Sequence, residues 1–255
     1  MEYVDVTVDG AVALIRMDRP PMNALSEVFG QELKSAFARC EDPSIRAVVV
    51  TGQPHFAAGA DINDFKKTFE SGSEEKTAST LLEAIRILEN LAKPTIAAVH
   101  GYALGGGCEL SLGCDFRYMA DNAKIGQPEI LLGIIPGAGG TQRLQRVIGF
   151  QKAKELIYTG RQVGAEEGLA IGYADKVAPS DELLDLALSD AAAWATAPTA
   201  ALAAAKRALA DGRGLTLADA LAVEQEAFRM SMTTDDAVEG VNAFIEKREA
   251  HFKGS

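Results

Sequence analysis

Short runs of β-branched and small apolar residues alternate with helical segments in the first half of the chain, and this alternation most constrains the fold. Apolar runs over 47–51 and 95–99 predict buried strands, and 116–120 predicts a third. Helical periodicity fills 79–91 and 104–113 between them. Buried strands separated by helices are typical of an α/β layer, so we predict an α/β fold.

The N-terminal residues predict a β-hairpin followed by a helix. Apolar and polar residues alternate over 4–8, Asp9-Gly10 is a favoured turn dipeptide, and an apolar run follows over 11–15. Ser26 is placed to cap the helix after the hairpin, since a serine oxygen can accept from the first free amides.

After about residue 140 the pattern becomes helical and alanine-rich. Helices are predicted over 150–158, 181–195, 199–211, 216–230 and 234–252. We expect two parts, an α/β core over 1–195 and a C-terminal helical region over 196–255 that caps or docks on the core.

Composition excludes several classes of protein. The formal net charge of −11 disfavours nucleic-acid binding, which needs a basic surface. Three cysteines are too few and odd in number for a disulfide framework, which indicates a reducing compartment. No apolar run approaches the roughly 18 residues of a membrane span. We expect a cytoplasmic protein, or a mature form whose targeting segment has been removed.

Three segments carry candidate chemistry. The first, 56–62, follows a strand and consists mostly of small residues, which let a ligand approach the backbone. It is open at this point whether the segment presents a backbone N–H to a ligand or is a tight turn packed on the core.

The second segment holds three consecutive glycines, Gly105 to Gly107, before Cys108-Glu109. Glycine costs about 1 kcal/mol in a helix interior relative to alanine, so the run suits a helix N-terminus with free amides facing a ligand. No Lys-Ser/Thr follows, as a phosphate-binding P-loop would need. Glu109 lies among apolar residues, either as a working acid or as a structural partner of a distant arginine.

The third segment covers 126–133 and continues to residue 141, and Glu129 is an isolated acid in it. Its glycines and prolines indicate irregular backbone, yet it is too apolar for a surface loop, so it predicts either a pocket wall or a loop whose glutamate caps a neighbour. Together the three segments supply backbone donors and two acids in dry surroundings. That set can stabilise an enolate oxygen while moving a proton.

On these residues the sequence resembles the enoyl-CoA hydratase (crotonase) family. The matching blocks are Phe-Ala-Ala-Gly-Ala-Asp-Ile at 56–62, Gly-Tyr-Ala-Leu-Gly-Gly-Gly-Cys-Glu-Leu at 101–110, Gly-Gln-Pro-Glu-Ile-Leu-Leu-Gly at 126–133 and Ile-Pro-Gly-Ala-Gly-Gly-Thr-Gln-Arg-Leu at 135–144. The resemblance implies a spiral of ββα units with a C-terminal helical subdomain. It also implies a homotrimer or a dimer of trimers, in which 196–255 would mediate trimerisation.

The resemblance further implies an acyl-CoA thioester substrate and a set of site residues. Glu109 and Glu129 would be catalytic, and the amides of Ala60 and Gly106 would form the oxyanion hole. Further contacts to coenzyme A or the acyl group are implied for Ala58, Asp61, Ile62 and Gly137, and for Phe244 and Lys247, which would reach a neighbouring subunit's coenzyme A.

The implied reaction is addition of water to a 2-trans-enoyl-CoA, giving a 3-hydroxyacyl-CoA, with Glu109 as base and Glu129 as acid. No metal and no separate cofactor are expected, and we expect neither nucleic-acid nor membrane partners. Two alternatives stay open on the same fold: an enoyl-CoA isomerase or related acyl-CoA chemistry, and a non-catalytic interaction protein. The sequence leaves the acyl chain length and the metabolic pathway open.

Overall fold

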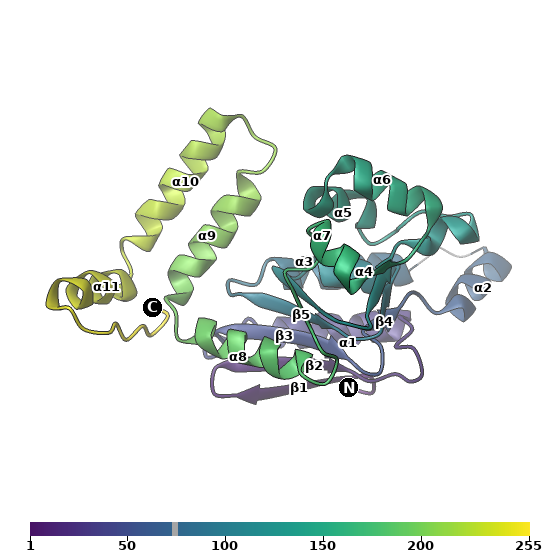
Figure 1. Ribbon diagram of the computed structural model, residues 1–255, viewed down its shortest axis with the longest axis horizontal. Helices are drawn as coiled ribbons and strands as arrows, with labels where there is room; N and C mark the ends of the chain where they lie inside the picture. Colours follow the sequence, from purple (N-terminus) through teal and green to yellow (C-terminus); the bar gives the residue numbers. More distant parts are fainter. Residues whose placement is uncertain (73–75) are drawn as a thin grey trace.

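The computed structural model describes residues 1–72 and 76–255, and its centre is a six-stranded sheet (Figure 1). The spatial order of its strands is β1-β2-β3-β5-β7-β10, and all pairs except β1–β2 are parallel. The strands are Val4–Asp9, Val12–Met17, Ala47–Gly52, Thr95–Val99, Phe116–Ala120 and Lys176–Ala178. The three predicted strands are thus confirmed as β3, β5 and β7, and every residue of β3 and β5 is buried.

The predicted hairpin and its helix cap are also confirmed. Strands β1 and β2 pair antiparallel across the Asp9-Gly10 turn, where Gly10 has φ +55°. Helix α1 (Glu27–Arg39) begins after Ser26, whose side chain accepts from the Phe29 N–H at 3.2 Å.

A second, four-stranded sheet has the order β4-β6-β8-β9. Its strands are Ala57–Ala58, Tyr102–Leu104, Lys124–Gly126 and Val163–Gly164. In each of the pairs β3/β4, β5/β6 and β7/β8, the first strand belongs to the six-stranded sheet and the second to the four-stranded sheet. Helices follow each pair in the chain. This repeat is the predicted succession of ββα units, and it places the ends of β4, β6 and β8 side by side.

Helices cover the sheets and fill the space between them. Helix α1 packs on α3 (Thr77–Glu89), and α8 (Leu183–Ala195) lies on β2, β3, β5 and β7 (Figure 1). Helix α4 (Gly106–Leu112) is buried at every residue, because it contacts β4, β6, α3 and α5. The other helices of the core are α2 (Ile62–Ser71), the 3-10 helix η1 (Pro128–Leu132), α5 (Gly140–Ile148), α6 (Phe150–Thr159) and α7 (Ala165–Ala170).

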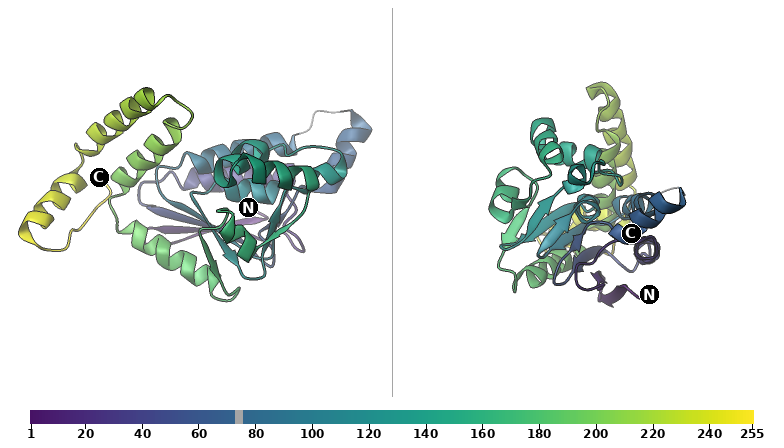
Figure 2. Two further views of the ribbon diagram at one scale, coloured as in Figure 1. Left: turned by 45° about the horizontal axis from the view of Figure 1, so that its top comes forward. Right: turned by 90° about the vertical axis from the view of Figure 1, so that its right-hand side faces the viewer.

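The last three helices project from the core (Figure 1; Figure 2, left). They are α9 (Thr199–Asp211), α10 (Leu217–Ser231) and α11 (Asp235–Glu246). Arg46 ties their base to the core: its guanidinium donates to Ala197 O at 2.5 Å, Phe252 O at 3.0 Å and Thr199 Oγ1 at 2.8 Å. The boundary predicted at 195/196 lies in the turn between α8 and α9.

Two predicted helices were too long. The helix expected over 104–113 starts at Gly106, because 102–104 is strand β6 and Gly105 takes φ +51°. The helix expected over 234–252 ends at Glu246, where Lys247 adopts a left-handed conformation at φ +56°. Across the described ranges, no helix is both long and apolar enough to cross a membrane.

Candidate active site

A mostly apolar cavity of about 410 Å³ opens where the ends of β4 and β6 meet α3, α4 and η1. Its lining includes residues from all three candidate segments: Ala58, Ala60, Ile62, Gly106, Glu109, Glu129 and Gly137. The structure therefore brings together seven of the predicted site residues, and apolar side chains such as Leu25, Leu81 and Ile134 complete the wall.

Neighbouring atoms leave no room for side chains at Gly106 and Gly107. Gly105 turns the chain from β6 into α4 with φ +51°. A Cβ on Gly106 would lie 2.9 Å from Leu81 Cδ2, and a Cβ on Gly107 would lie 1.9 Å from Ala57 O. The glycines thus let the start of α4 lie directly against β4, with its first amides at the cavity.

The amides of Ala60 and Gly106 are free to meet a ligand at this cavity. Leu25 N donates to Gly59 O and Asp61 N donates to Leu25 O, each at 2.8 Å, so the N–H of Ala60 between them points away from Leu25. Gly106 opens α4, and the first amides of a helix have no intrahelical acceptor. Two such donors on one cavity can stabilise a developing oxyanion.

Glu109 is 3 % exposed and its carboxylate is held by backbone amides. Its Oε1 accepts from Ala138 N at 2.7 Å and from Gly140 N at 2.8 Å, at the N-terminus of α5. Burial raises the pKa of Glu109, and the hydrogen bonds from Gly140 and Ala138 oppose that rise because they favour the charged form. The ionised state of this carboxyl is thus supported inside an apolar wall.

Glu129 lies on η1, facing the same cavity in different surroundings. Burial, helped by the charge of Glu109, raises its pKa to about 7. Gln127 is fully buried beside it; with the amide oriented to satisfy its hydrogen bonds, the nitrogen donates to Glu129 Oε1 at 2.9 Å and Oε2 at 3.1 Å. A pKa of about 7 leaves Glu129 divided between its protonated and ionised forms near neutral pH, so this carboxyl can both hold and release a proton.

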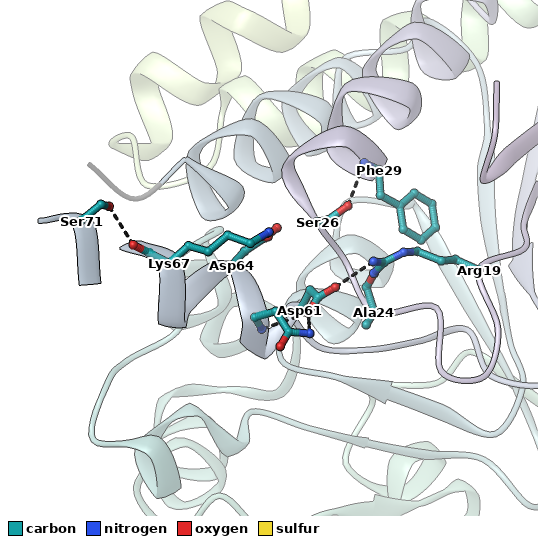
Figure 3. A network of polar contacts seen from close by, with 9 residues as sticks. Arg19, Ala24, Ser26, Phe29, Asp61, Asp64, Lys67 and Ser71 are labelled. Atoms are coloured by element: carbon teal, nitrogen blue, oxygen red, sulfur yellow. Dashed lines mark hydrogen bonds and ion pairs between the residues drawn. The ribbon is translucent and has the colours of Figure 1, made fainter. Parts of the chain in front are cut away.

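Asp61 is a predicted contact residue that does not line this cavity. Its carboxylate caps α2 by accepting from Asn63 N at 3.0 Å and pairs with Arg19 Nη2 at 2.7 Å (Figure 3). Arg19 also donates to Ala24 O. Because Asp61 follows Ala60 directly, this network holds the turn that presents the Ala60 amide. The ion pair lies in a neighbouring polar cleft that shares Thr68 and Thr77 with the cavity.

Comparison with known proteins identifies the family of this chain. The family model described as enoyl-CoA hydratase/isomerase matches residues 7–255. The chain belongs to this family. It is 40% identical to a crotonyl-CoA hydratase of Syntrophomonas wolfei over 98% of both chains, and 40% identical to a short-chain-enoyl-CoA hydratase of Clostridium acetobutylicum over 94% of both.

Solved structures show the same fold. The crystal structure of an enoyl-CoA hydratase from Bacillus anthracis matches with a TM-score of 0.92 and 38% identity, covering 99% of this chain and all of that one. The crotonase-like fold predicted from the sequence is therefore confirmed.

Phe244 and Lys247 lie far from the cavity of the same chain. Both belong to the α11 end of the molecule, whereas α2, which contributes Ile62 to the cavity, lies at the opposite end (Figures 1 and 2). Phe244 is 86% exposed. Neither residue lines the cavity of its own chain, and their contact with a neighbouring subunit's coenzyme A stays a prediction.

Sequence reasoning missed three contributors to the site. Gln127 contacts Glu129, and Ala138 and Gly140 hold Glu109 through main-chain groups. Gln127 carried a usable signal, since it is a polar side chain two residues before Glu129 in an otherwise apolar segment. The two main-chain donors carried none, because an N–H group does not depend on residue type.

Proposed function

We propose that this chain hydrates 2-trans-enoyl-CoA thioesters, acting as an enoyl-CoA hydratase. The proposal rests on one observation above all: one apolar cavity is lined by two free amides and by two carboxyls with different hydrogen-bond partners. Neighbouring hydratases in sequence and structure support the same reaction.

The thioester carbonyl would accept from the amides of Ala60 and Gly106. As water adds to C3, electron density moves through C2 onto the thioester oxygen and an enolate-like charge develops there. Donors fixed in a dry site stabilise that charge without reorganising, and one such donor is worth about 10²–10³ in rate. The Gly106 amide gains further from the positive end of the α4 dipole.

Glu109 would take a proton from the attacking water. Its Oε1 is occupied by the amides of Ala138 and Gly140, so Oε2 is the oxygen that faces the water. The oxygen of the water bonds to C3 as its proton passes to Glu109. A general base of this kind contributes roughly 10²–10⁴ in rate.

Glu129 would deliver its proton to C2 as the enolate collapses to the thioester. Its pKa of about 7 leaves a substantial protonated fraction at neutral pH that is able to give the proton up. One water is consumed, one C–O and one C–H bond form, and the C2–C3 double bond becomes single. The glutamates finish in exchanged protonation states, and one proton transfer between them or through solvent restores the enzyme.

Hydration of crotonyl-CoA tests the proposal. The purified chain should bleach the ultraviolet absorbance of the conjugated thioester and form 3-hydroxybutyryl-CoA that carries ¹⁸O when the solvent is H₂¹⁸O. Loss of absorbance without incorporation of the label would contradict hydration. Conversion of a 3-enoyl-CoA to the 2-enoyl isomer, with no hydration of crotonyl-CoA, would support the isomerase alternative.

We also propose that no metal or separate cofactor takes part, because two carboxyls can perform both proton transfers and coenzyme A enters as part of the substrate. Activity that persists after dialysis against a chelator is the expected result. A homotrimer or dimer of trimers, built with the 196–255 helices, and a cytoplasmic location complete the proposal. Light scattering on the purified protein measures the assembly directly.

A further inference from the structure

We propose that Arg143, held in turn by Glu89, is a positioning residue for Glu109. Its guanidinium fixes the 138–140 turn whose two amides hold the Glu109 carboxylate. The inference rests on the proposed function, in which Glu109 activates water, and adds a pair of charged residues that the mechanism does not otherwise use.

The 138–140 turn is held from both sides. On the cavity side, Ala138 N and Gly140 N donate to Glu109 Oε1. On the other side, Arg143 Nη1 donates to Ala138 O at 2.9 Å. The guanidinium folds back over Gly139, where φ is +107° and a Cβ would lie 2.0 Å from Arg143 Nη1. Glycine at this position thus makes room for the arginine contact.

Glu89 fixes the guanidinium itself. Its carboxylate accepts from Arg143 Nε at 3.1 Å and from Nη2 at 2.7 Å, which is a two-point contact. Glu89 is the last residue of α3, so the pair ties the start of α5 to the end of the helix that contributes Leu81 to the cavity wall. The Arg143 side chain is 14% exposed and that of Glu89 is 45% exposed, so the arginine is the better protected partner.

The charge of Arg143 also favours the ionised form of Glu109. It lowers the pKa of that carboxyl against the rise caused by burial. Glu129 faces the same cavity, and Glu89 lies on the far side of the arginine. Loss of the guanidinium removes a positive charge that lowers the pKa of Glu109, so that pKa should rise.

Replacement of Arg143 should lower kcat with little change in KM. We expect Arg143→Gln to lose about 10-fold or more in kcat, because displacement of a catalytic group by about 1 Å can cost about 10². The acid limb of the pH–rate profile should also move to higher pH. Arg143→Lys keeps the charge without the planar fork, so the limb should return toward the wild-type position while kcat stays low.

Arg146→Gln is the matched control, on the same helix. Arg146 Nη1 donates to Gln142 O at 2.8 Å, which leaves the 138–140 turn untouched, so wild-type kcat and an unmoved acid limb are expected. A second readout is the ¹³C titration of the Glu109 carboxyl, assigned with Glu109→Gln. It needs no turnover, and the transition should move upward in Arg143→Gln.

The outcomes separate this inference from the proposed function. A wild-type chain that does not hydrate crotonyl-CoA contradicts the function, while the carboxyl titration still tests the position of Arg143. Wild-type kcat and an unmoved carboxyl titration in Arg143→Gln overturn the inference. So does a loss matched by Arg146→Gln with the acid limb unmoved. If Arg143→Gln fails to fold, Arg143→Lys and Glu89→Gln test the same contacts, and wild-type kcat in both overturns it.

Discussion

Polar side chains are buried around the cavity, whereas large apolar side chains are exposed on the C-terminal helices. Around the cavity, Glu109 is buried and accepts two backbone amides, and Gln127 is buried against Glu129. On α9, α10 and α11 large apolar side chains face outward instead. They include Leu209, Leu217, Leu221, Phe228, Met230, Val238, Val241, Phe244 and Ile245.

This contrast distinguishes a site formed within one chain from a surface that we expect another chain to cover. Burial of a carboxyl without partners costs several kcal/mol, so the contacts around the glutamates are a condition of their position. Exposed apolar surface on this scale is typical of an interface with another protein. We therefore expect the catalytic groups to be organised within one subunit, and the C-terminal helices to find their partners in neighbouring copies.

Removal of either catalytic carboxyl should have the largest effect. We expect Glu109→Gln and Glu129→Gln each to lose about 10² or more in kcat, because glutamine keeps the shape but can neither take up nor give the proton. Stopped-flow hydration of crotonyl-CoA measures the loss. Near-normal turnover by either variant would remove that residue from the mechanism.

The close packing beneath the site can be tested separately from the chemistry. Gly107→Ala should destabilise the fold by about 3 kcal/mol, since the new Cβ would meet Ala57 O at 1.9 Å and a strand or helix must shift. Gly164→Ala is the control, because a Cβ there meets open space at an ordinary φ of −80°. Urea unfolding measures both, and equal effects would show that α4 does not depend on this contact.

Glu129 should lower the stability of the fold while serving catalysis. Its raised pKa means that the folded protein keeps a proton that the unfolded chain has lost between about pH 4.5 and 7, so stability falls as pH rises through that window. Glu129→Gln should therefore gain roughly 1–3 kcal/mol at pH 8 and little at pH 4. Unfolding of this variant is compared with that of Glu166→Gln, an exposed glutamate on α7. A gain that is independent of pH would contradict the assignment.

Substitution of an exposed residue on α11 should have little effect on folding. Phe244→Ala should change the free energy of unfolding of the isolated chain by no more than about 0.5 kcal/mol, because the ring is exposed. If α11 completes a neighbour's coenzyme A site, KM should rise several-fold while kcat stays close to wild type. An unchanged KM in an assembled protein would reject the predicted role of Phe244.

Local patterns in the sequence predicted the parts of the fold that are long and regular. The β-branched runs of β3 and β5 and the Ser26 cap are examples, since each depends on neighbouring residues. The second sheet escaped prediction because β4 and β9 have two residues each and β6 and β8 three, too few to show a period.

The candidate site also has parts that the sequence predicted and parts that it did not. Glu109 and Glu129 stood out as isolated acids in apolar segments, and the glycine run marked the start of α4. The contact between Arg143 and Ala138 O was hidden, because a side chain folding back onto its own turn leaves no spacing to detect. Its partner Glu89 is 54 residues away in sequence, and only the packing of α3 near α5 brings the two together.

The proposed mechanism depends most on which glutamate carries the proton in the free enzyme. The direct measurement is a ¹³C NMR titration of the glutamate carboxyls in the wild-type protein, with Glu129→Gln for assignment. We predict one transition near pH 7 that disappears in Glu129→Gln and moves to lower pH in Glu109→Gln, where the neighbouring charge is gone. A transition near pH 7 that persists in Glu129→Gln, or disappears in Glu109→Gln, would reverse the roles of acid and base and contradict the mechanism.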